Sequence, residues 1–242
     1  MKGEPAPRPA GGTTAVSASP SAAAAASTEA ARVRVTEIFL SIQGESLTQG
    51  LPTVFVRLTG CPLRCRYCDT AYAFSGGRTM EVGEVLAEVA AAGVRNVTVT
   101  GGEPLAQRGA LELLRRLCDA GHEVSLETSG ALDVAPVDRR VVKVMDIKTP
   151  GSGEAHRNRW ENLAHLGPRD QVKIVVRDRA DYEWARAMIR ERGLAGRWPV
   201  LLSPSHGELE PRLLAEWILA DRLPVRLQVQ LHKLLWGDVP GR

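Results

Sequence analysis

The 242-residue sequence has only four cysteines, a formal net charge of just +3 and no long apolar run. Four cysteines in this length do not suggest a disulfide framework, and the clustering of three of them suits metal ligation in a reducing compartment. No apolar run approaches the roughly eighteen residues of a membrane-spanning helix. No run of five or more lysines and arginines argues for nucleic-acid binding. We therefore expect a cytoplasmic protein that binds neither membranes nor nucleic acids.

The first 31 residues are almost free of large apolar side chains and are rich in Ala, Pro, Ser, Gly and Thr. Such a segment cannot bury enough surface to offset the entropy lost on ordering. It also lacks the basic start and leucine-rich stretch of a signal peptide. We predict that residues 1–31 form a disordered, low-complexity tail and that residues 32–242 form one globular domain.

Beyond residue 32, apolar segments typical of strands alternate with helical patterns. The predicted strands are 33–40, 53–58, 96–100, 123–127, 141–147, 171–176, 200–203 and 225–230, and the predicted helices are 82–92, 105–120, 160–166, 181–191 and 211–220. This alternation predicts an α/β fold with a parallel sheet built from right-handed crossovers. Roughly 210 residues are available, fewer than the approximately 250 of a closed eightfold barrel. We therefore expect a partial, open (βα) TIM-like barrel of about six parallel strands.

Three cysteines, Cys61, Cys65 and Cys68, stand in a C-x3-C-x2-C spacing directly after the predicted strand 53–58. A structural zinc site needs four protein ligands, and here a second cysteine pair is missing. Iron–sulfur clusters normally take four thiolates. Three thiolates on a [4Fe–4S] cluster would leave one iron open to a substrate or cofactor. The fourth cysteine, Cys118, lies on the apolar face of the predicted helix 105–120, so we expect it in the core.

The cysteine spacing, followed about one βα unit later by G-G-E-P at 101–104, resembles the radical S-adenosylmethionine (SAM) enzymes. The resemblance implies a [4Fe–4S] cluster held by the three cysteines, with SAM as the second cofactor. Ser129 stands where the family's E-T-N-G has asparagine. The residues expected near SAM are Tyr67, Cys68, Asp69, Gly101, Gly102, Glu103, Ser129, Asp146, Ile147, Lys148 and Ser203.

The glycines and the glutamate among these residues are chemically suited to binding SAM. Gly101 and Gly102 lack side chains, so backbone groups can approach a ligand closely. Glu103 can accept a hydrogen bond from the SAM ammonium group. Its alternative role is that of a carboxylate favoured by the positive end of a helix dipole.

Further segments resemble the 7-carboxy-7-deazaguanine synthases. They are S-I-Q-G-E at 41–45, F-V-R-L-T-G-C at 55–61, C-D-T at 68–70, D-Q-V-K-I-V-V at 170–176 and Q-L-H-K at 230–233. The resemblance implies a homodimeric lyase of 7-deazapurine and queuosine biosynthesis. It would convert 6-carboxy-5,6,7,8-tetrahydropterin to 7-carboxy-7-deazaguanine with loss of ammonia, after a 5′-deoxyadenosyl radical takes a hydrogen atom from C6. A flavodoxin or ferredoxin would supply the electron.

The substrate site is expected at the ends of the predicted strands. Arg57 can pair bidentately with the substrate carboxylate, and a surface arginine is the alternative reading. His232 is as suited to a structural role as to a substrate contact. The resemblance also implies that Thr70 is a Mg²⁺ ligand. One hydroxyl can suffice, because Mg²⁺ often keeps waters and substrate oxygens in its coordination shell. The expected substrate residues are Ile42, Gln43, Gly44, Glu45, Arg57, Thr100, His232 and Pro240.

Two rival functions share part of this pattern. A radical SAM activase of a glycyl radical enzyme would also carry the three cysteines and G-G-E-P, but has no need of Q-G-E, Arg57 and Q-L-H-K together. A zinc-stabilised RNA-binding module would need a fourth metal ligand and a basic face, and the sequence offers neither clearly.

Overall fold

A computed structural model of the chain describes residues 1–4, 31–237, 239 and 241. The predicted tail therefore lies almost entirely outside the described residues, as does Pro240. Within the described ranges, no helix is both long and apolar enough to cross a membrane.

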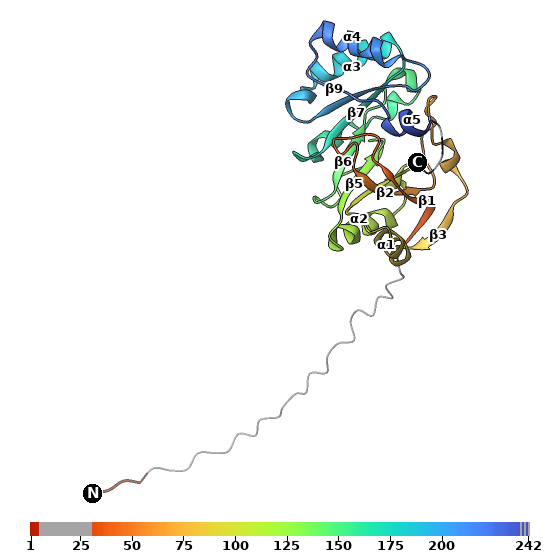
Figure 1. The fold of residues 1–242 in the computed structure, drawn as a ribbon. Coiled ribbons are helices and arrows are strands. Elements are labelled where there is room, and N and C mark those ends of the chain that lie inside the picture. The colour runs from red at the N-terminus through yellow and green to blue at the C-terminus, as the bar shows by residue number, and fades with distance from the viewer. Residues whose placement is uncertain (5–30, 238, 240, 242) are drawn as a thin grey trace.

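Nine strands form one sheet in the order β3-β1-β2-β4-β5-β6-β7-β8-β9 (Figure 1). The strands are β1 (Arg32–Ile42), β2 (Pro52–Leu58), β3 (Arg78–Glu81), β4 (Asn96–Gly101), β5 (Glu123–Thr128), β6 (Val142–Asp146), β7 (Gln171–Val176), β8 (Val200–Pro204) and β9 (Arg226–Leu227). Pairing is parallel from β2 through β9, and β1 pairs antiparallel with β2 and β3. In the part of the chain described, β3 and β9 remain the two edges, which confirms the open partial barrel.

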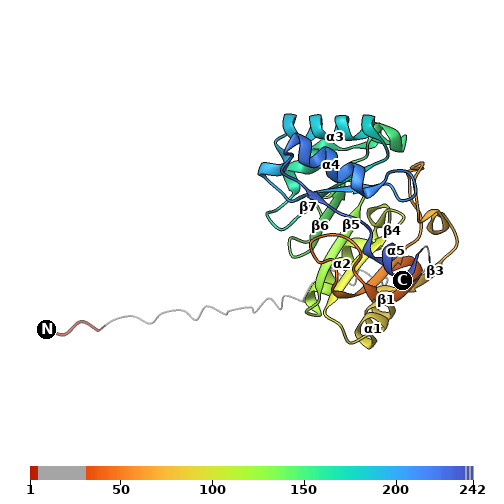
Figure 2. The same cartoon turned by 45° about the horizontal axis from the view of Figure 1, so that its top comes forward.

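Helices α1 (Val82–Ala91), α2 (Gly109–Asp119), α3 (Arg179–Glu191) and α4 (Pro211–Asp221) pack on one face of this sheet. The short α5 (Leu231–Trp236) belongs to neither apolar cluster and contacts the loop after β2 instead. Figures 1 and 2 both show α1 and α2 at one end of the molecule and α3 and α4 at the other. Each pair covers its own apolar cluster against the sheet. Cys118 is half-buried against the first cluster, in agreement with its predicted core position.

The alternation of side chains along each strand separates this core from the inner face of the sheet. Val97 and Val99 of β4 belong to the helix-side core, whereas Thr98 and Thr100 point the other way. β7 repeats the pattern, with Lys173 on the inner face between two core residues. The inner face thus carries polar side chains in a mostly parallel sheet, where apolar residues are the rule.

The predicted helix 105–120 is wrong in its first part. A 3₁₀ turn spans Pro104–Ala106, and α2 begins only at Gly109. Between them Gln107 is extended, because its side-chain amide donates to the carbonyls of Arg34 and Thr59 at 2.9 Å each and accepts the N–H of Arg34 at 2.7 Å. This contact between distant segments outweighs the local helical pattern.

Two other predicted elements also differ. Residues 160–166 form a 3₁₀ helix, Trp160–His165, in place of an α-helix. The predicted strand 225–230 is reduced to β9, after which Gln228 bonds Ser46 of the β1–β2 loop through its side chain. β3 and α5 are additional elements that the sequence pattern did not predict.

Leu126 of β5 is fully buried in the first apolar cluster. Leu126→Ala should lower the free energy of unfolding by about 2–5 kcal/mol through lost burial and a residual cavity. The matched control is Leu219→Ala on α4, where the side chain is 74% exposed and the expected change is within about 0.5 kcal/mol. Urea unfolding of the two variants measures this, and equal destabilisation would contradict the packing described.

Candidate active site

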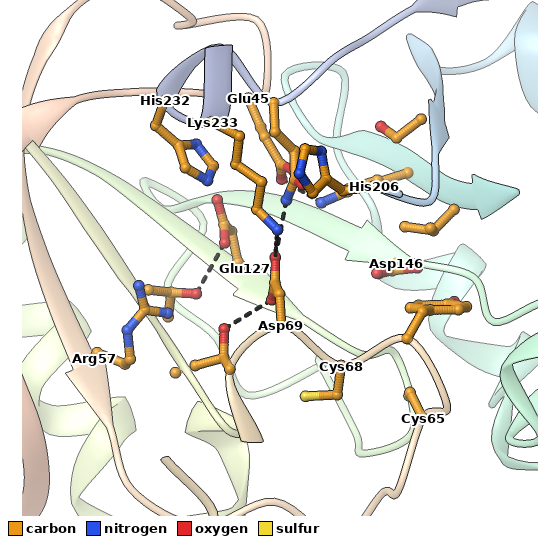
Figure 3. A pocket seen from close by; sticks show the side chains of 18 of the residues that line it. Glu45, Arg57, Cys65, Cys68, Asp69, Glu127, Asp146, His206, His232 and Lys233 are labelled. Atoms are coloured by element: carbon orange, nitrogen blue, oxygen red, sulfur yellow. Dashed lines mark hydrogen bonds and ion pairs between the residues drawn. The ribbon is translucent and has the colours of Figure 1, made fainter. Parts of the chain in front are cut away.

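A cavity of about 620 Å³ lies at the carboxyl ends of the parallel strands (Figure 3). It lies where active sites of βα folds usually form. Eighteen of the predicted site residues line it: Ile42, Gln43, Glu45, Arg57, Cys61, Cys65, Tyr67, Cys68, Asp69, Thr70, Thr100, Gly101, Gly102, Ser129, Asp146, Lys148, Ser203 and His232. Gly44, Glu103 and Ile147 are not in its lining. Pro240 is among the residues that are not described.

The cysteine loop is fastened to the turn after β4 by backbone contacts. The N–H of Gly102 donates to the carbonyl of Leu58 at 3.0 Å, and the N–H of Glu103 donates to the carbonyl of Gly60 at 2.8 Å. A Cβ atom on Gly101 or Gly102 would lie about 2 Å from one of those carbonyl oxygens, and Gly101 has a φ of +133°. Glycine is therefore required here by the packing of two loops, whether or not a ligand also binds.

Cys61, Cys65 and Cys68 are all free, and each is partly exposed towards the cavity. Burial raises the pKa of each thiol, that of Cys65 to about 11. The thiols therefore need a bound positive group to become thiolates at neutral pH.

The spacing of these side chains bears on the kind of metal site. Among the described residues, no three His, Cys, Asp or Glu side chains are arranged to hold one metal ion. Thiolates that each bind a different iron of a cluster need no such convergence. The three cysteines can therefore hold a cluster without converging on one metal position.

Four buried polar atoms at the cavity have no hydrogen-bond partner in the described structure: Glu45 Oε1, Tyr67 Oη, Asp146 Oδ1 and Ser203 Oγ. Buried polar atoms are nearly always hydrogen-bonded, so these four indicate a polar ligand. Burial raises the pKa of Tyr67, so its hydroxyl keeps its proton at neutral pH. Tyr67, Asp146 and Ser203 are among the residues predicted to border SAM, whose ribose, adenine and amino-acid groups could satisfy them.

Lys148 supplies a positive charge beside the cysteines. Its Nζ lies 2.8 Å from Asp146 Oδ2 and 5.8 Å from the centre of the Tyr67 ring. Burial alone would lower the pKa of Lys148, but Asp146, Tyr67 and Cys65 outweigh that effect and raise it. The ammonium group therefore stays charged and can stabilise the thiolate forms of the neighbouring cysteines.

Glu103 is held by hydrogen bonds within the protein. Its fully buried carboxylate accepts hydrogen bonds from four donors: the N–H of Leu105, the hydroxyl of Thr128, and both the N–H and the hydroxyl of Ser129. The shortest, from Ser129 Oγ, is 2.5 Å. Glu103 thus joins the loops after β4 and β5. Its contact with the SAM ammonium stays a prediction.

Arg57 is partly buried rather than on the surface. Its Nε donates to Glu37 Oε1 at 2.7 Å, and its guanidinium lies 5.8 Å from the ring centres of both Phe39 and Tyr72. Tyr72 also donates to Glu37 at 2.7 Å. These contacts hold the guanidinium at the cavity wall, where it can bind an anionic group.

Gln43 and Gly44 shape the β1–β2 loop. The amide of Gln43 donates to Thr98 Oγ1 at 2.9 Å and accepts the N–H of Glu45 at 3.1 Å, so its hydrogen-bonding groups are partly used inside the protein. A Cβ on Gly44 would lie 2.0 Å from Nδ1 of His232, so only glycine lets that ring pack here. Burial lowers the pKa of His232, which favours the neutral imidazole at pH 7.

Helix α5 contacts the cysteine loop through Asp69. Gln230 Nε2 donates to Asp69 Oδ2 at 3.0 Å, and Lys233 Nζ lies 3.3 Å from the same oxygen (Figure 3). The Thr70 hydroxyl donates to the other oxygen at 2.9 Å. Burial would raise the pKa of Asp69, but these partners lower it below the ordinary value. Asp69 therefore remains ionised beside Thr70.

Several cavity residues were missed by sequence reasoning, chiefly Glu127, Lys173 and Lys233. A usable signal existed for Lys173, the one charged residue of β7, since a lysine inside an apolar strand of a buried sheet faces a site or a partner. Glu127 lies one residue before the end of β5, where βα active-site residues gather.

Comparison with known proteins identifies the family. Residues 55–146 match the Radical SAM superfamily. The chain is 51% identical over 214 residues to the 7-carboxy-7-deazaguanine synthase of Chlorobaculum tepidum, covering 87% of this chain and 97% of that one. The chain belongs to the 7-carboxy-7-deazaguanine synthase family. It is therefore a radical SAM enzyme, with SAM and a [4Fe–4S] cluster as its cofactors.

Other members support this assignment. The 7-carboxy-7-deazaguanine synthase of Koribacter versatilis is 45% identical over 221 residues, covering 84% of this chain and 97% of that one. The crystal structure of QueE from Escherichia coli superposes with a TM-score of 0.69 at 24% identity, over 83% of this chain and 95% of that chain. At that identity the superposition supports the fold alone.

The cluster assignment predicts a sharp difference among the four cysteines. Replacing Cys61, Cys65 or Cys68 by Ala should remove most of the iron and sulfide from anaerobically reconstituted protein. Cys118→Ala should retain both, because Cys118 packs in the core. Iron and sulfide analysis checks this, and loss of iron from the Cys118 variant would show that a cluster ligand has been misassigned.

Proposed function

We propose that the protein converts 6-carboxy-5,6,7,8-tetrahydropterin into 7-carboxy-7-deazaguanine with loss of ammonia. Membership of the synthase family supports this reaction. The observation that carries it is the single cavity that brings the three cysteines, the unpartnered polar atoms and Arg57 together. A glycyl radical activase would not need a cationic group held in this small-molecule cavity.

In this proposal the chain's own residues bind and orient the pterin. Arg57 pairs with its carboxylate, while Glu45 and Gln43 contact the pyrimidine edge, which offers donors and acceptors. Thr100, whose hydroxyl donates to Glu127 at 2.9 Å, and His232 border the ring. Burial of these groups excludes water from the reacting carbon.

The cofactor side follows from the same cavity. Cys61, Cys65 and Cys68 would hold the cluster, and Gly101–Gly102, Tyr67 and Asp146 would hold SAM. Together the two cofactors would supply a 5′-deoxyadenosyl radical, released with methionine when SAM takes up one electron, which is chemistry that the protein itself cannot perform. Lys148 keeps positive charge beside the thiolates throughout.

Thr70 is the proposed Mg²⁺ ligand. Thr70 lines the cavity, its hydroxyl donates to the ionised Asp69, and oxygen ligands are those that Mg²⁺ prefers. Substrate oxygens and water would complete the shell, and the ion would orient the substrate.

The remaining assignments concern partners and location. We infer a flavodoxin or ferredoxin as electron donor, since the exposed face of the cysteine loop carries Arg64 and Arg66, which suit an acidic donor.

We infer a homodimer from the family resemblance, and sedimentation of the reconstituted protein at twice the chain mass would support it. Free thiols suit a reducing compartment, the cytoplasm. Residues 32–242 would form one radical SAM domain.

The reaction is tested by anaerobic assay of reconstituted protein with SAM, Mg²⁺, the tetrahydropterin and a reductant, followed by mass spectrometry. Pterin-dependent formation of 7-carboxy-7-deazaguanine is the expected result, with dithionite or with a flavodoxin. Accumulation of 5′-deoxyadenosine that does not respond to the pterin would instead favour the activase.

Thr70→Val removes the hydroxyl while keeping the side-chain shape. If Thr70 binds Mg²⁺, this variant should lower turnover on the order of tenfold or more and raise the Mg²⁺ concentration needed for half-maximal rate. Thr70→Ser, which keeps the hydroxyl, is the control. Equal Mg²⁺ dependence in the wild type and Thr70→Val would exclude the assignment.

A further inference from the structure

Lys173 of β7 lies on the inner face of the sheet and lines the cavity, yet none of the roles above uses it. Its ammonium group forms an ion pair with Glu45 Oε2, across 128 positions of sequence. The Lys173 side chain is only 14% exposed and that of Glu45 only 9%, so water screens the pair weakly.

The ion pair uses only one of the two carboxylate oxygens of Glu45. Glu45 Oε1 is buried, lines the cavity and has no hydrogen-bond partner in the described structure. Lys173 therefore holds one carboxylate oxygen while the second is available to a ligand. The loop that carries Glu45 is also tied to β7 nearby, where the N–H of Leu47 donates to Gln171 Oε1 at 2.9 Å.

Lys173 also acts electrostatically on a second carboxyl group, that of Glu127. Burial, and then the charge of Glu45, raises the pKa of Glu127, whereas the charge of Lys173 opposes that rise. Burial alone would lower the pKa of Lys173, but Glu45, Asp146 and Glu127 outweigh it and raise the value. Lys173 is thus the cation shared by carboxyl groups from the β1–β2 loop, β5 and β6.

We propose that Lys173 is a positioning residue for the pterin: it holds Glu45 as an acceptor whose unpartnered oxygen receives N–H donors of the pyrimidine edge. This inference rests on the proposed function. A carboxylate on a loop can rotate about its side-chain bonds. The ion pair with Lys173 limits that rotation for Glu45 and so fixes the direction of its second oxygen.

The charged and titratable groups facing this centre come from all the elements packed around it: Glu45, Arg57, Tyr67, Asp69, Glu127, Asp146, His232 and Lys233. Asp146 already pairs with Lys148, and Asp69 with Lys233. Burial keeps His232 neutral at pH 7. If Lys173 is removed, Glu45 loses the cation that holds Oε2, and Glu127 keeps only the charge of Arg57 beside it.

The test measures binding of 6-carboxytetrahydropterin by calorimetry to anaerobic holoenzyme with SAM and without reductant. Lys173→Met should weaken pterin binding at least about tenfold at pH 7. Lys173→Arg, which keeps the charge, should bind nearly as the wild type does.

Two further variants separate positioning from folding. Glu45→Gln combined with Lys173→Met should bind no more weakly than Glu45→Gln alone, because the two residues act as one unit. Lys143→Met is the matched control, since Lys143 forms a buried 2.8 Å ion pair with Asp170 in the same sheet but does not line the cavity. It should leave the pterin affinity of the folded protein unchanged.

Unchanged pterin affinity in Lys173→Met, or additive losses in the double variant, would overturn the inference. A wild-type holoenzyme that binds SAM but no pterin would instead overturn the proposed function. The two failures are therefore distinguishable in one series of titrations.

Discussion

The contact between the cysteine loop and the turn after β4 is the constraint on which the site depends. Two backbone hydrogen bonds join the segments, to the carbonyls of Leu58 and Gly60, and they form only because Gly101 and Gly102 have no Cβ atoms to collide with those carbonyls. Glu103, the next residue, extends the connection to the loop after β5. Three neighbouring strand ends are thereby held in fixed relation, with the cysteine loop bonded to the turn after β4.

Charge pairing prepares the same cavity for its ligands. Asp146 with Lys148, Glu45 with Lys173, Asp69 with Lys233 and Arg57 with Glu37 each place a charged group at or beside the cavity wall with a partner that holds it. A buried charge without a partner would be costly. Two of these pairs, at Glu45 and Asp146, also leave one carboxylate oxygen unpartnered. The polar wall is thus formed before ligands arrive, which lowers the cost of ordering it on binding.

The order of strands and helices was predictable because the apolar periodicity of each segment is local. Once the strands were placed, the convergence of the cysteines, the glycine pair and Lys148 was also predictable. Each follows a strand, and parallel strands end at one edge of the sheet. Contacts between distant segments were not predictable. Gln107 interrupts a helical pattern because its amide bonds β1. Lys173 was visible as a charged residue in an apolar strand, but nothing local identifies Glu45 as its partner. The four protein donors that bond Glu103 come from residues 105, 128 and 129, and no local pattern names the last two as its partners.

The central claim is that the cluster, SAM and the pterin meet in this one cavity, so that the radical reaches C6 of the substrate. Turnover of substrate deuterated at C6 tests it most directly, with mass spectrometry of the 5′-deoxyadenosine formed. The account predicts that 5′-deoxyadenosine gains the deuterium while 7-carboxy-7-deazaguanine is produced. Formation of the product with unlabelled 5′-deoxyadenosine would contradict it, because the radical would then act at another position.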